Sequence, residues 1–336
     1  MNRKLKVLGL IATALVATLS LSGCVSETTQ GTSDETITIY SGRSEDLIAE
    51  LITLFTEETG ISASVRYGDS AELAAQILEE GANSPADVFF SQDAGALAAL
   101  SQEGILKVLP EDITSVVEPK YRAEDGTWVG VSGRARVLSY NPEKVSEIPN
   151  SVLDLTDPSW KGRIGIAPSN ASFQAFVTAL RVLEGEEVAV KFLEGMKENA
   201  VLFEKNSQIL AAVEDGVVDA GLVNHYYWYE IAAERGEENM TSKFTWFQDG
   251  DIGNLVNVAG VGVLNDRASS SSFAKWLLSE SAQKFFVEKT REYSLTGLPQ
   301  VAGLISLDEI QSPEIDLADL SSLSITLDLI RKAGLL

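Results

Sequence analysis

The residues best suited to chemistry are four consecutive aromatic side chains, Tyr226-Tyr227-Trp228-Tyr229, in a chain whose residues are only 7% aromatic. Neighbouring side chains cannot share a face of a regular helix or strand, but two hydroxyls can converge in a turn that enters a helix. A phenolate is a hard anionic ligand that suits a hard, highly charged cation such as Fe³⁺. A free tyrosine has a pKa of about 10, so two phenolates near neutral pH need a strong positive charge, which a trivalent metal supplies. The alternative is that the run forms an aromatic face of a core helix.

The elements around this run alternate between strand and helix. The pattern predicts a strand at 219–223 that delivers residues 224–229 to its carboxyl end. Earlier in the chain the same alternation predicts strands at 37–40, 61–67 and 87–90, with helices at 47–55 and 71–78 between them. Short joins between such elements indicate an α/β fold with a parallel sheet covered by helices, in which ligands bind at the carboxyl ends of the strands.

Two longer apolar β runs, 128–140 and 255–264, are predicted to cross between two lobes. The N-lobe is then expected to span 36–133 and 257–305, and the C-lobe 134–256 and 306–336. A cleft between two lobes joined by crossing strands is a common place for a ligand.

Residues 1–23 are predicted to be a cleaved export signal, because basic residues precede an apolar run from 7 to 19 that is too short to span a membrane. The sequence Leu21-Ser22-Gly23-Cys24 resembles the lipobox of bacterial lipoproteins, so Cys24 is expected to be lipidated, which anchors a protein to a membrane without crossing it. The alternative is an ordinary signal peptide with an incidental cysteine. Residues 24–35 are polar and are predicted to be a flexible tether.

Composition excludes several classes of function. With 26 basic and 49 acidic residues the formal net charge is −23, which argues against nucleic acid as a partner and is compatible with attraction of cations. One cysteine permits neither an intrachain disulfide nor a thiolate metal cage. One histidine, one cysteine and no phosphate-binding loop of the Gly-x-x-x-x-Gly-Lys type make an enzyme unexpected.

Six short motifs, in order and at matching spacing, resemble the ferric-iron-binding solute-binding proteins that feed ABC importers, also called bacterial transferrins. The motifs are residues 39–42, 85–89, 132–137, 160–165, 205–207 and 224–229. The resemblance implies a two-lobed periplasmic-binding-protein fold of type II. It also implies a monomeric extracytoplasmic receptor, anchored to the membrane through Cys24, that captures ferric iron, bare or chelated. The receptor would deliver the iron to a permease and, through it, to an ATPase.

The resemblance implies roles for particular residues. The family's paired iron ligands fall on Tyr226 and Tyr227, and its loop for a synergistic anion such as carbonate or phosphate falls on Asn170, Ala171 and Ser172, with Asn206 and Asn224 nearby. Backbone N–H groups at a helix start bind anions readily. Asn170 and Ser172 are also ordinary helix-capping residues, and the two roles are compatible.

The sequence departs from the family where the N-lobe supplies ligands. The family's histidine and glutamate positions are Ser44 and Gln92 here, so Asp93 or the carbonyl oxygen of Gln92 are the candidate N-lobe ligands. Water or a chelating anion is expected to fill the remaining positions, with Arg43 and Arg134 neutralising the anion. The alternative for both arginines is a structural salt bridge.

Two further expectations concern the single histidine, His225, and an alternative ligand for the same fold. His225 adjoins Tyr226 and is expected to point away from the metal, either supporting the site or lying at the surface. Because the N-lobe ligands are replaced, the same fold binding a sugar phosphate or phosphonate through Arg43 and Arg134 is the alternative function. Colour separates the two, because Fe³⁺ bound by phenolates absorbs visible light and a sugar-phosphate complex does not.

Overall fold

The computed structural model describes residues 35–336. The predicted signal peptide, Cys24 and nearly all of the predicted tether lie outside this range. The strands are β1 (Thr36–Ser41), β2 (Ser62–Tyr67), β3 (Val88–Ser91), β4 (Trp128–Tyr140), β5 (Ile164–Ile166), β6 (Ala200–Leu202), β7 (Ala220–Asn224), β8 (Lys243–Thr245), β9 (Val256–Val263) and β10 (Tyr293–Ser294). The α-helices are α1 (Glu45–Thr59), α2 (Ser70–Glu80), α3 (Ala94–Gln102), α4 (Glu111–Thr114), α5 (Ala171–Glu184), α6 (Glu186–Asn199), α7 (Asn206–Glu214), α8 (Tyr226–Arg235), α9 (Ala268–Leu277), α10 (Glu280–Glu288) and α11 (Leu323–Lys332). None of these helices is long and apolar enough to span a bilayer.

Local sequence explains these elements. In α1 the buried side chains Ile48, Leu51 and Phe55 recur at helical spacing. The helix ends at Gly60, whose φ of 73° lies in the left-handed region that glycine adopts without strain. The short strand β3 is buried along its whole length, as expected for a central strand of a covered sheet.

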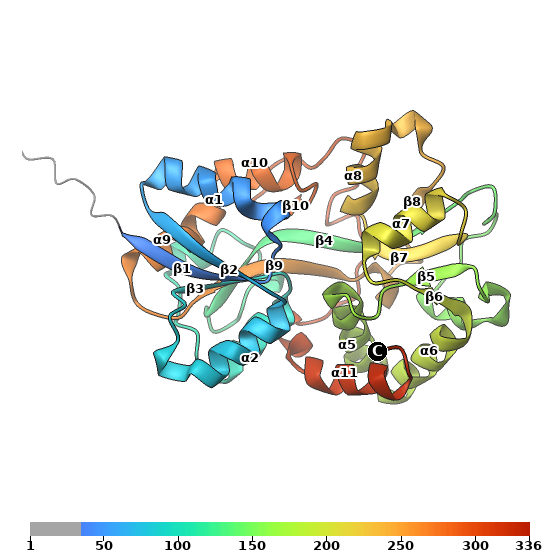
Figure 1. Cartoon of the computed structure of the whole chain (residues 1–336), viewed down its shortest axis with the longest axis horizontal. Coiled ribbons are helices and arrows are strands. Elements are labelled where there is room, and N and C mark those ends of the chain that lie inside the picture. The colour runs from blue at the N-terminus through green and yellow to red at the C-terminus, as the bar shows by residue number, and fades with distance from the viewer. Residues whose placement is uncertain (1–34) are drawn as a thin grey trace, which may run out of the picture. The chain divides into compact units, whose positions relative to one another are not determined.

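The strands form two groups that are joined by β4 (Figure 1). In the first group β2, β1 and β3 are parallel, and β9 runs antiparallel between β3 and the first part of β4. In the second group β6, β5 and β7 are parallel, and β7 and β8 pair antiparallel with the last part of β4. The change from one group to the other falls between Ala135, which pairs with Val256, and Arg136, which pairs with Asn224. We call the two groups, with their helices, the first and the second lobe.

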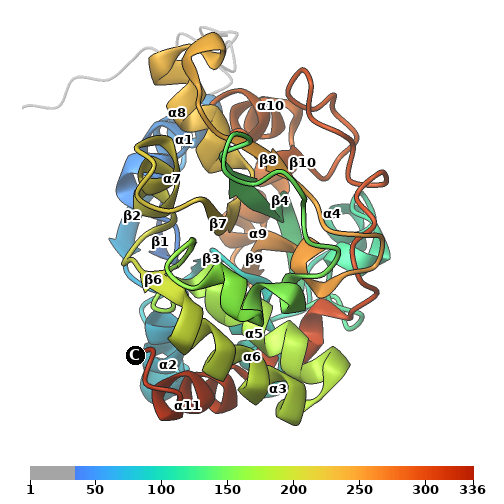
Figure 2. The same ribbon diagram turned by 90° about the vertical axis from the view of Figure 1, so that its right-hand side faces the viewer.

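Helices cover both faces of each group of strands. In the first lobe α1, α9 and α10 lie on one side and α2 and α3 on the other (Figures 1 and 2). In the second lobe α7 and α8 lie on one side, whereas α5, α6 and α11 lie on the other (Figures 1 and 2). The loops at the carboxyl ends of β1, β3, β5 and β7 therefore point towards the region between the lobes, as the parallel arrangement requires.

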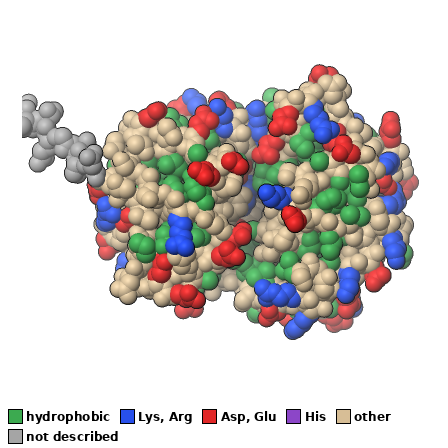
Figure 3. Space-filling view, in the orientation of Figure 1, with side chains coloured by type: hydrophobic (Ala, Val, Ile, Leu, Met, Phe, Trp, Pro, Cys, Tyr) green, Lys and Arg blue, Asp and Glu red, His purple; other side chains and the backbone are tan. Residues whose placement is uncertain are grey.

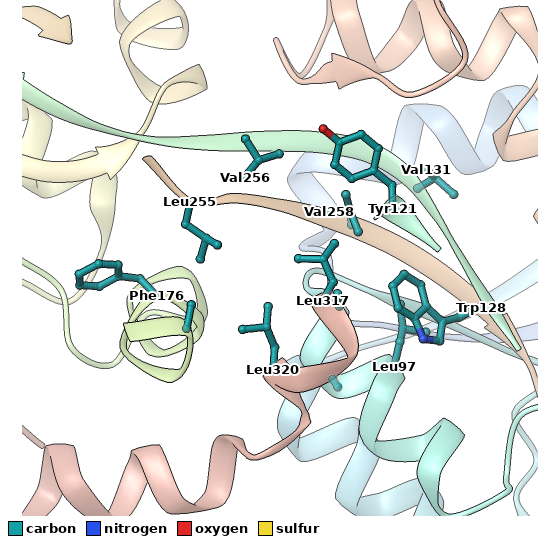
Figure 4. Packing of buried hydrophobic residues seen from close by; sticks show 14 of the residues in the cluster. Leu97, Tyr121, Trp128, Val131, Phe176, Leu255, Val256, Val258, Leu317 and Leu320 are labelled. Atoms are coloured by element: carbon teal, nitrogen blue, oxygen red, sulfur yellow. The ribbon is translucent and has the colours of Figure 1, made fainter. Parts of the chain in front are cut away.

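The core continues below the crossing strands. Leu97 of α3 and Trp128 of β4 pack near Leu317 and Leu320 (Figure 4). These two leucines belong to a 3₁₀ helix, Leu317–Ser321, which packs mainly on α3 and also contacts α5, and α11 after it packs on α5. The lobe boundaries remain a prediction, and Leu317–Ser321 contacts helices of both lobes.

Candidate functional site

The site is built around the turn that joins β7 to α8. Tyr226 and Tyr227 begin α8, and their ring centroids are 4.3 Å apart at an interplanar angle of 33°. Each hydroxyl lies close enough to the other to influence its pKa, so the two side chains converge as a turn entering a helix allows. Tyr229 instead packs with Trp228 and Phe244, at centroid distances of 5.3 and 5.8 Å. The aromatic run thus divides between a pair of converging tyrosines and a core cluster. The core interpretation holds for Tyr229, and the ligand role of Tyr226 and Tyr227 stays a prediction.

The surroundings keep both hydroxyls protonated without a metal. Burial raises the pKa of Tyr226 well above its ordinary value of 10, and the nearby hydroxyl of Tyr227 raises it further. Burial also raises the pKa of Tyr227, although the neighbouring side chains of Tyr226 and Asn206 act in the opposite direction. The positive charge of Arg134 lowers both values but does not outweigh burial. Forming two phenolates here therefore requires a further, strong positive charge.

The predicted anion loop lies beside this pair. Asn170 caps α5, and its Oδ1 accepts hydrogen bonds from the backbone N–H of Ser172 at 3.0 Å and from Ser172 Oγ at 2.7 Å. The amide of Asn206 donates to the same two side chains, at 3.3 and 3.1 Å, and its own Oδ1 is buried without a partner. Asn170, Ser172 and Asn206 therefore form one polar cluster, and Asn206 lies near enough to Tyr227 to lower its pKa. The capping role of Asn170 is established by these contacts, and the anion role stays a prediction.

A second arginine, which the sequence analysis did not single out, lies at the same edge. Arg136 lines a small cavity with Arg134, Ser172, Asn224 and Asn257. Its Nη1 donates to the carbonyl of Ser172 at 3.1 Å, whereas Nε and Nη2 are buried without partners. Burial lowers the pKa of Arg136 to about 9. The signal for this residue was its spacing, because residues two apart on a strand share a face and Arg134 was already a candidate.

Arg43 forms a buried salt bridge with Glu292. It is 1% exposed, and its guanidinium contacts both carboxylate oxygens of Glu292, at 2.7 and 3.2 Å. Arg134 shares the same carboxylate, with Nε 3.9 Å from Oε1. Arg43 therefore forms the structural salt bridge of the alternative interpretation, and its contact with an anion stays a prediction. Burial raises the pKa of Glu292, but the two arginines, Arg43 first, outweigh this effect and keep it below the ordinary value.

The two candidate N-lobe ligands have other contacts. Asp93 is the N-cap of α3, and its Oδ1 accepts from the backbone N–H of Ala96 at 3.1 Å. Its side chain also faces a cavity of about 280 Å³ that Ala171 lines from the start of α5. The carbonyl of Gln92 accepts a hydrogen bond from Arg134, and its Oε1 is buried without a partner. A metal contact by Gln92 or Asp93 therefore stays a prediction.

His225 lies inside the protein rather than at the surface, with an exposure of 0%. Both ring nitrogens contact backbone groups, of Ala135 and of Arg291, so neither is free for a metal. Burial lowers its pKa to about 4. Across residues 35–336, no group of three or more His, Cys, Asp or Glu side chains is placed to hold a metal ion.

Glu230, one helical turn after the tyrosines, gives a prediction about stability. Burial, with Glu292 and Glu234 nearby, raises its pKa from 4.5 to about 7. Between these values the folded protein holds a proton that the unfolded chain has released, so the free energy of unfolding falls as pH rises from about 4.5 to 7. We expect Glu230→Gln to remove this loss, of up to about 3 kcal/mol, with little effect below pH 4.5.

Urea unfolding of the wild type and of Glu230→Gln at pH 4.5, 6 and 8 checks this expectation. Glu57→Gln, at an exposed position of α1 and not among the groups that shift the pKa of Glu230, is the matched control. Parallel stability–pH curves for wild type and Glu230→Gln would contradict it.

This chain is similar in sequence to a family of known proteins. Residues 83–302 match the family model described as bacterial extracellular solute-binding protein. The Fe(3+)-binding periplasmic protein of Serratia marcescens is 35% identical over 310 residues, which cover 90% of this chain and 91% of that protein. The major ferric iron-binding protein of Neisseria meningitidis serogroup B is 35% identical over 309 residues, which cover 89% of this chain and 93% of that protein.

Solved structures are similar over nearly the whole described part. Iron-bound HitA from Pseudomonas aeruginosa superimposes with a TM-score of 0.84 and 36% identity, covering 89% of this chain and 99% of that one. A Trichodesmium protein, IdiA or FutA, in complex with iron and citrate has a TM-score of 0.74 and 28% identity over the same shares. The predicted α/β fold, the two-lobed type II periplasmic-binding-protein fold, is confirmed by these similarities.

Proposed function

We propose that this chain, which belongs to the family of bacterial extracellular solute-binding proteins, captures ferric iron with Tyr226 and Tyr227 and delivers it to an ABC-type permease. One observation carries the proposal: two adjacent tyrosines converge, with ring centroids 4.3 Å apart, beside the polar side chains at the junction of the two lobes. Two phenolates are hard anionic ligands, and they match ferric iron better than a soft metal. The names of the similar proteins of Serratia and Neisseria, which state ferric-iron binding, support the choice of metal.

The protein is further proposed to act outside the cytoplasmic membrane, attached by a lipid on Cys24, as a monomer that hands iron to permease subunits and their ATPase. The lipobox-like sequence before Cys24 and the family description support this location. Acidic and basic side chains are interspersed on the face shown in Figure 3, and no continuous basic patch marks that face as a nucleic-acid surface. Capture and release need no covalent step, so no enzymatic activity is proposed.

Ferric iron bound by the two tyrosines needs a further anion as ligand. Two phenolates leave ferric iron with one net positive charge and roughly four open positions of an octahedral site. An uncompensated charge in a closed cleft is unfavourable. We propose that carbonate, phosphate or a chelator such as citrate fills these positions. Asn170, Ala171 and Ser172 at the start of α5, with Asn206, Asn224 and Arg134, would hold the anion.

Binding of ferric iron should therefore depend on the buffer anion. We expect at least about tenfold tighter binding in carbonate, phosphate or citrate than in an anion-poor buffer of equal ionic strength, the lower end of what loss of supporting groups costs a metal site. Titrations in the four buffers measure this. Equally tight binding in all four would show that protein side chains complete the coordination, and Asp93→Asn would then test the remaining carboxylate.

Equilibrium dialysis against ferric nitrilotriacetate tests the proposed function itself. Metal analysis should find one iron per chain for the wild type, and far less for a variant in which both Tyr226 and Tyr227 are phenylalanine. Equal iron content in the two proteins would place the metal elsewhere and refute the proposal.

A further inference from the structure

His225 is held by three contacts at the point where the two lobes meet. Its backbone N–H donates to the carbonyl of Ala135 at 3.0 Å, which extends the pairing of β7 with β4 by one residue. Its ring nitrogen Nδ1 accepts from the backbone N–H of Ala135 at 3.2 Å. Its other ring nitrogen, Nε2, lies 2.9 Å from the carbonyl oxygen of Arg291. Because Nδ1 acts as an acceptor, the proton of the neutral ring is on Nε2, and Nε2 donates to Arg291.

The last of these contacts crosses between the lobes. His225 belongs to the β7–α8 turn of the second lobe, whereas Arg291 lies between α10 and β10 of the first lobe. Its ring also packs against Tyr293 of β10, with centroids 4.7 Å apart, and edge-on against Tyr226 at 5.9 Å. The residue that directly precedes the tyrosine pair is thus fastened to the opposite lobe by its side chain.

The acceptor on the first lobe has an unusual backbone. Arg291 has a φ of 57° and is the only described residue other than glycine with a positive φ. A side chain in this region is strained and persists only where its surroundings hold it. Here Glu292, the next residue, is held by Arg43 and Arg134, and its Oε2 also accepts hydrogen bonds from Thr290 and Ser132. These contacts fix the peptide whose carbonyl receives the hydrogen bond from His225.

The contacts join both halves of the site. Arg43 comes from the loop after β1, and Arg134 also donates to the carbonyl of Gln92 after β3. A continuous series of contacts therefore runs from the tyrosine pair through His225, Arg291 and Glu292 to the two first-lobe loops that face the cleft. The series consists of buried groups with specific partners, which hold one arrangement more strictly than apolar packing does.

We infer that His225 is a positioning residue that ties the tyrosine pair of the second lobe to Arg291 of the first, so that the two hydroxyls face the first-lobe loops in a fixed orientation. The inference rests on the proposed capture of ferric iron by Tyr226 and Tyr227. His225 does not contact the metal in this account. Its loss should change how firmly the pair holds iron, and not only how stable the fold is.

Two substitutions at this position separate the contacts. In His225→Asn the short amide can replace Nδ1 at Ala135 but cannot reach Arg291. In His225→Gln the longer side chain places an amide N–H near the position of Nε2 and can restore the donation to Arg291. Trp228→Phe is the matched control, because it removes a hydrogen bond of 3.1 Å from the same helix to the carbonyl of Ser242, which lies within the second lobe. Arg291→Gly alters the link from the other side, since glycine tolerates the positive φ but leaves the peptide free to move.

Each protein is loaded with ferric nitrilotriacetate, and decay of the visible band is followed after addition of excess EDTA. Thermal unfolding is measured in parallel. We expect His225→Asn to lose iron about tenfold faster than wild type, as for a buried donor or acceptor left without its partner. His225→Gln and Trp228→Phe should remain within about threefold of wild type. Arg291→Gly should lose iron faster than wild type, and it decides the outcome if His225→Asn does not fold.

The inference would be overturned if His225→Asn or Arg291→Gly released iron at the wild-type rate. It would also be overturned if Trp228→Phe released iron as fast as His225→Asn does, or if His225→Gln released iron no more slowly than His225→Asn. A wild type that shows no visible band at all would refute the proposed function itself, and is thereby distinguished from failure of the role given to His225.

Discussion

Replacing Tyr226 or Tyr227 with phenylalanine should weaken ferric-iron binding by more than about 100-fold. Loss of a group that only supports a metal ligand costs about 10- to 100-fold in affinity, so loss of an anionic ligand itself should exceed that range. Phenylalanine keeps the ring and hence the stacking of the two side chains, whose centroids are 4.3 Å apart. The variant therefore removes the oxygen donor with little change in packing.

Competition with a chelator of known ferric affinity measures the loss for each variant. Tyr229→Phe is the matched control, because this hydroxyl belongs to the neighbouring aromatic cluster with Trp228 and Phe244. It should bind iron within about threefold of wild type. Wild-type affinity in both Tyr226→Phe and Tyr227→Phe would mean that these hydroxyls are not ligands.

Acidification should weaken iron binding steeply, by about 100-fold per pH unit below neutral pH. Both hydroxyls have a pKa raised by burial, so the iron-free protein holds both protons and must release them to bind the metal. Each proton released on binding changes the apparent affinity about tenfold per pH unit, and binding is lost as pH falls because protonation and the metal compete for the same oxygens.

The affinity is measured between pH 5.5 and 7.5 with a ferric chelator whose own protonation is known and subtracted. Tyr227→Phe supplies the control for the slope, since one phenol remains and the affinity should change only about tenfold per pH unit. A flat profile in the wild type, or an equal slope in the variant, would contradict ionisation of both tyrosines.

The fold was predictable from the sequence wherever local patterns are strong. The alternation of buried strands such as Val88–Ser91 with amphipathic helices such as Glu45–Thr59 indicates a covered parallel sheet. The course of the last segment was not predictable, because packing of Leu317 and Leu320 on α3 depends on tertiary contacts and leaves no periodic signal in a 3₁₀ helix of five residues.

The site was predictable from the sequence only where local structure places its residues. The convergence of Tyr226 and Tyr227 follows from their place in a strand-to-helix turn, and the capping contacts of Asn170 follow from its place before α5. The partner of Arg43 could not be found, since Glu292 is 249 residues away and is one of 49 acidic residues. Such a contact exists only once the crossing strands have brought the two segments together.

Visible absorption during titration with ferric nitrilotriacetate tests the central claim most directly. Phenolate ligation of Fe³⁺ produces an absorption band that neither the iron-free protein nor the titrant's own spectrum explains. We predict that this band grows linearly, stops at one iron per chain, and is absent from the variant in which both Tyr226 and Tyr227 are phenylalanine. Binding of one iron per chain without such a band, or an unchanged band in that variant, would contradict capture of ferric iron by this tyrosine pair.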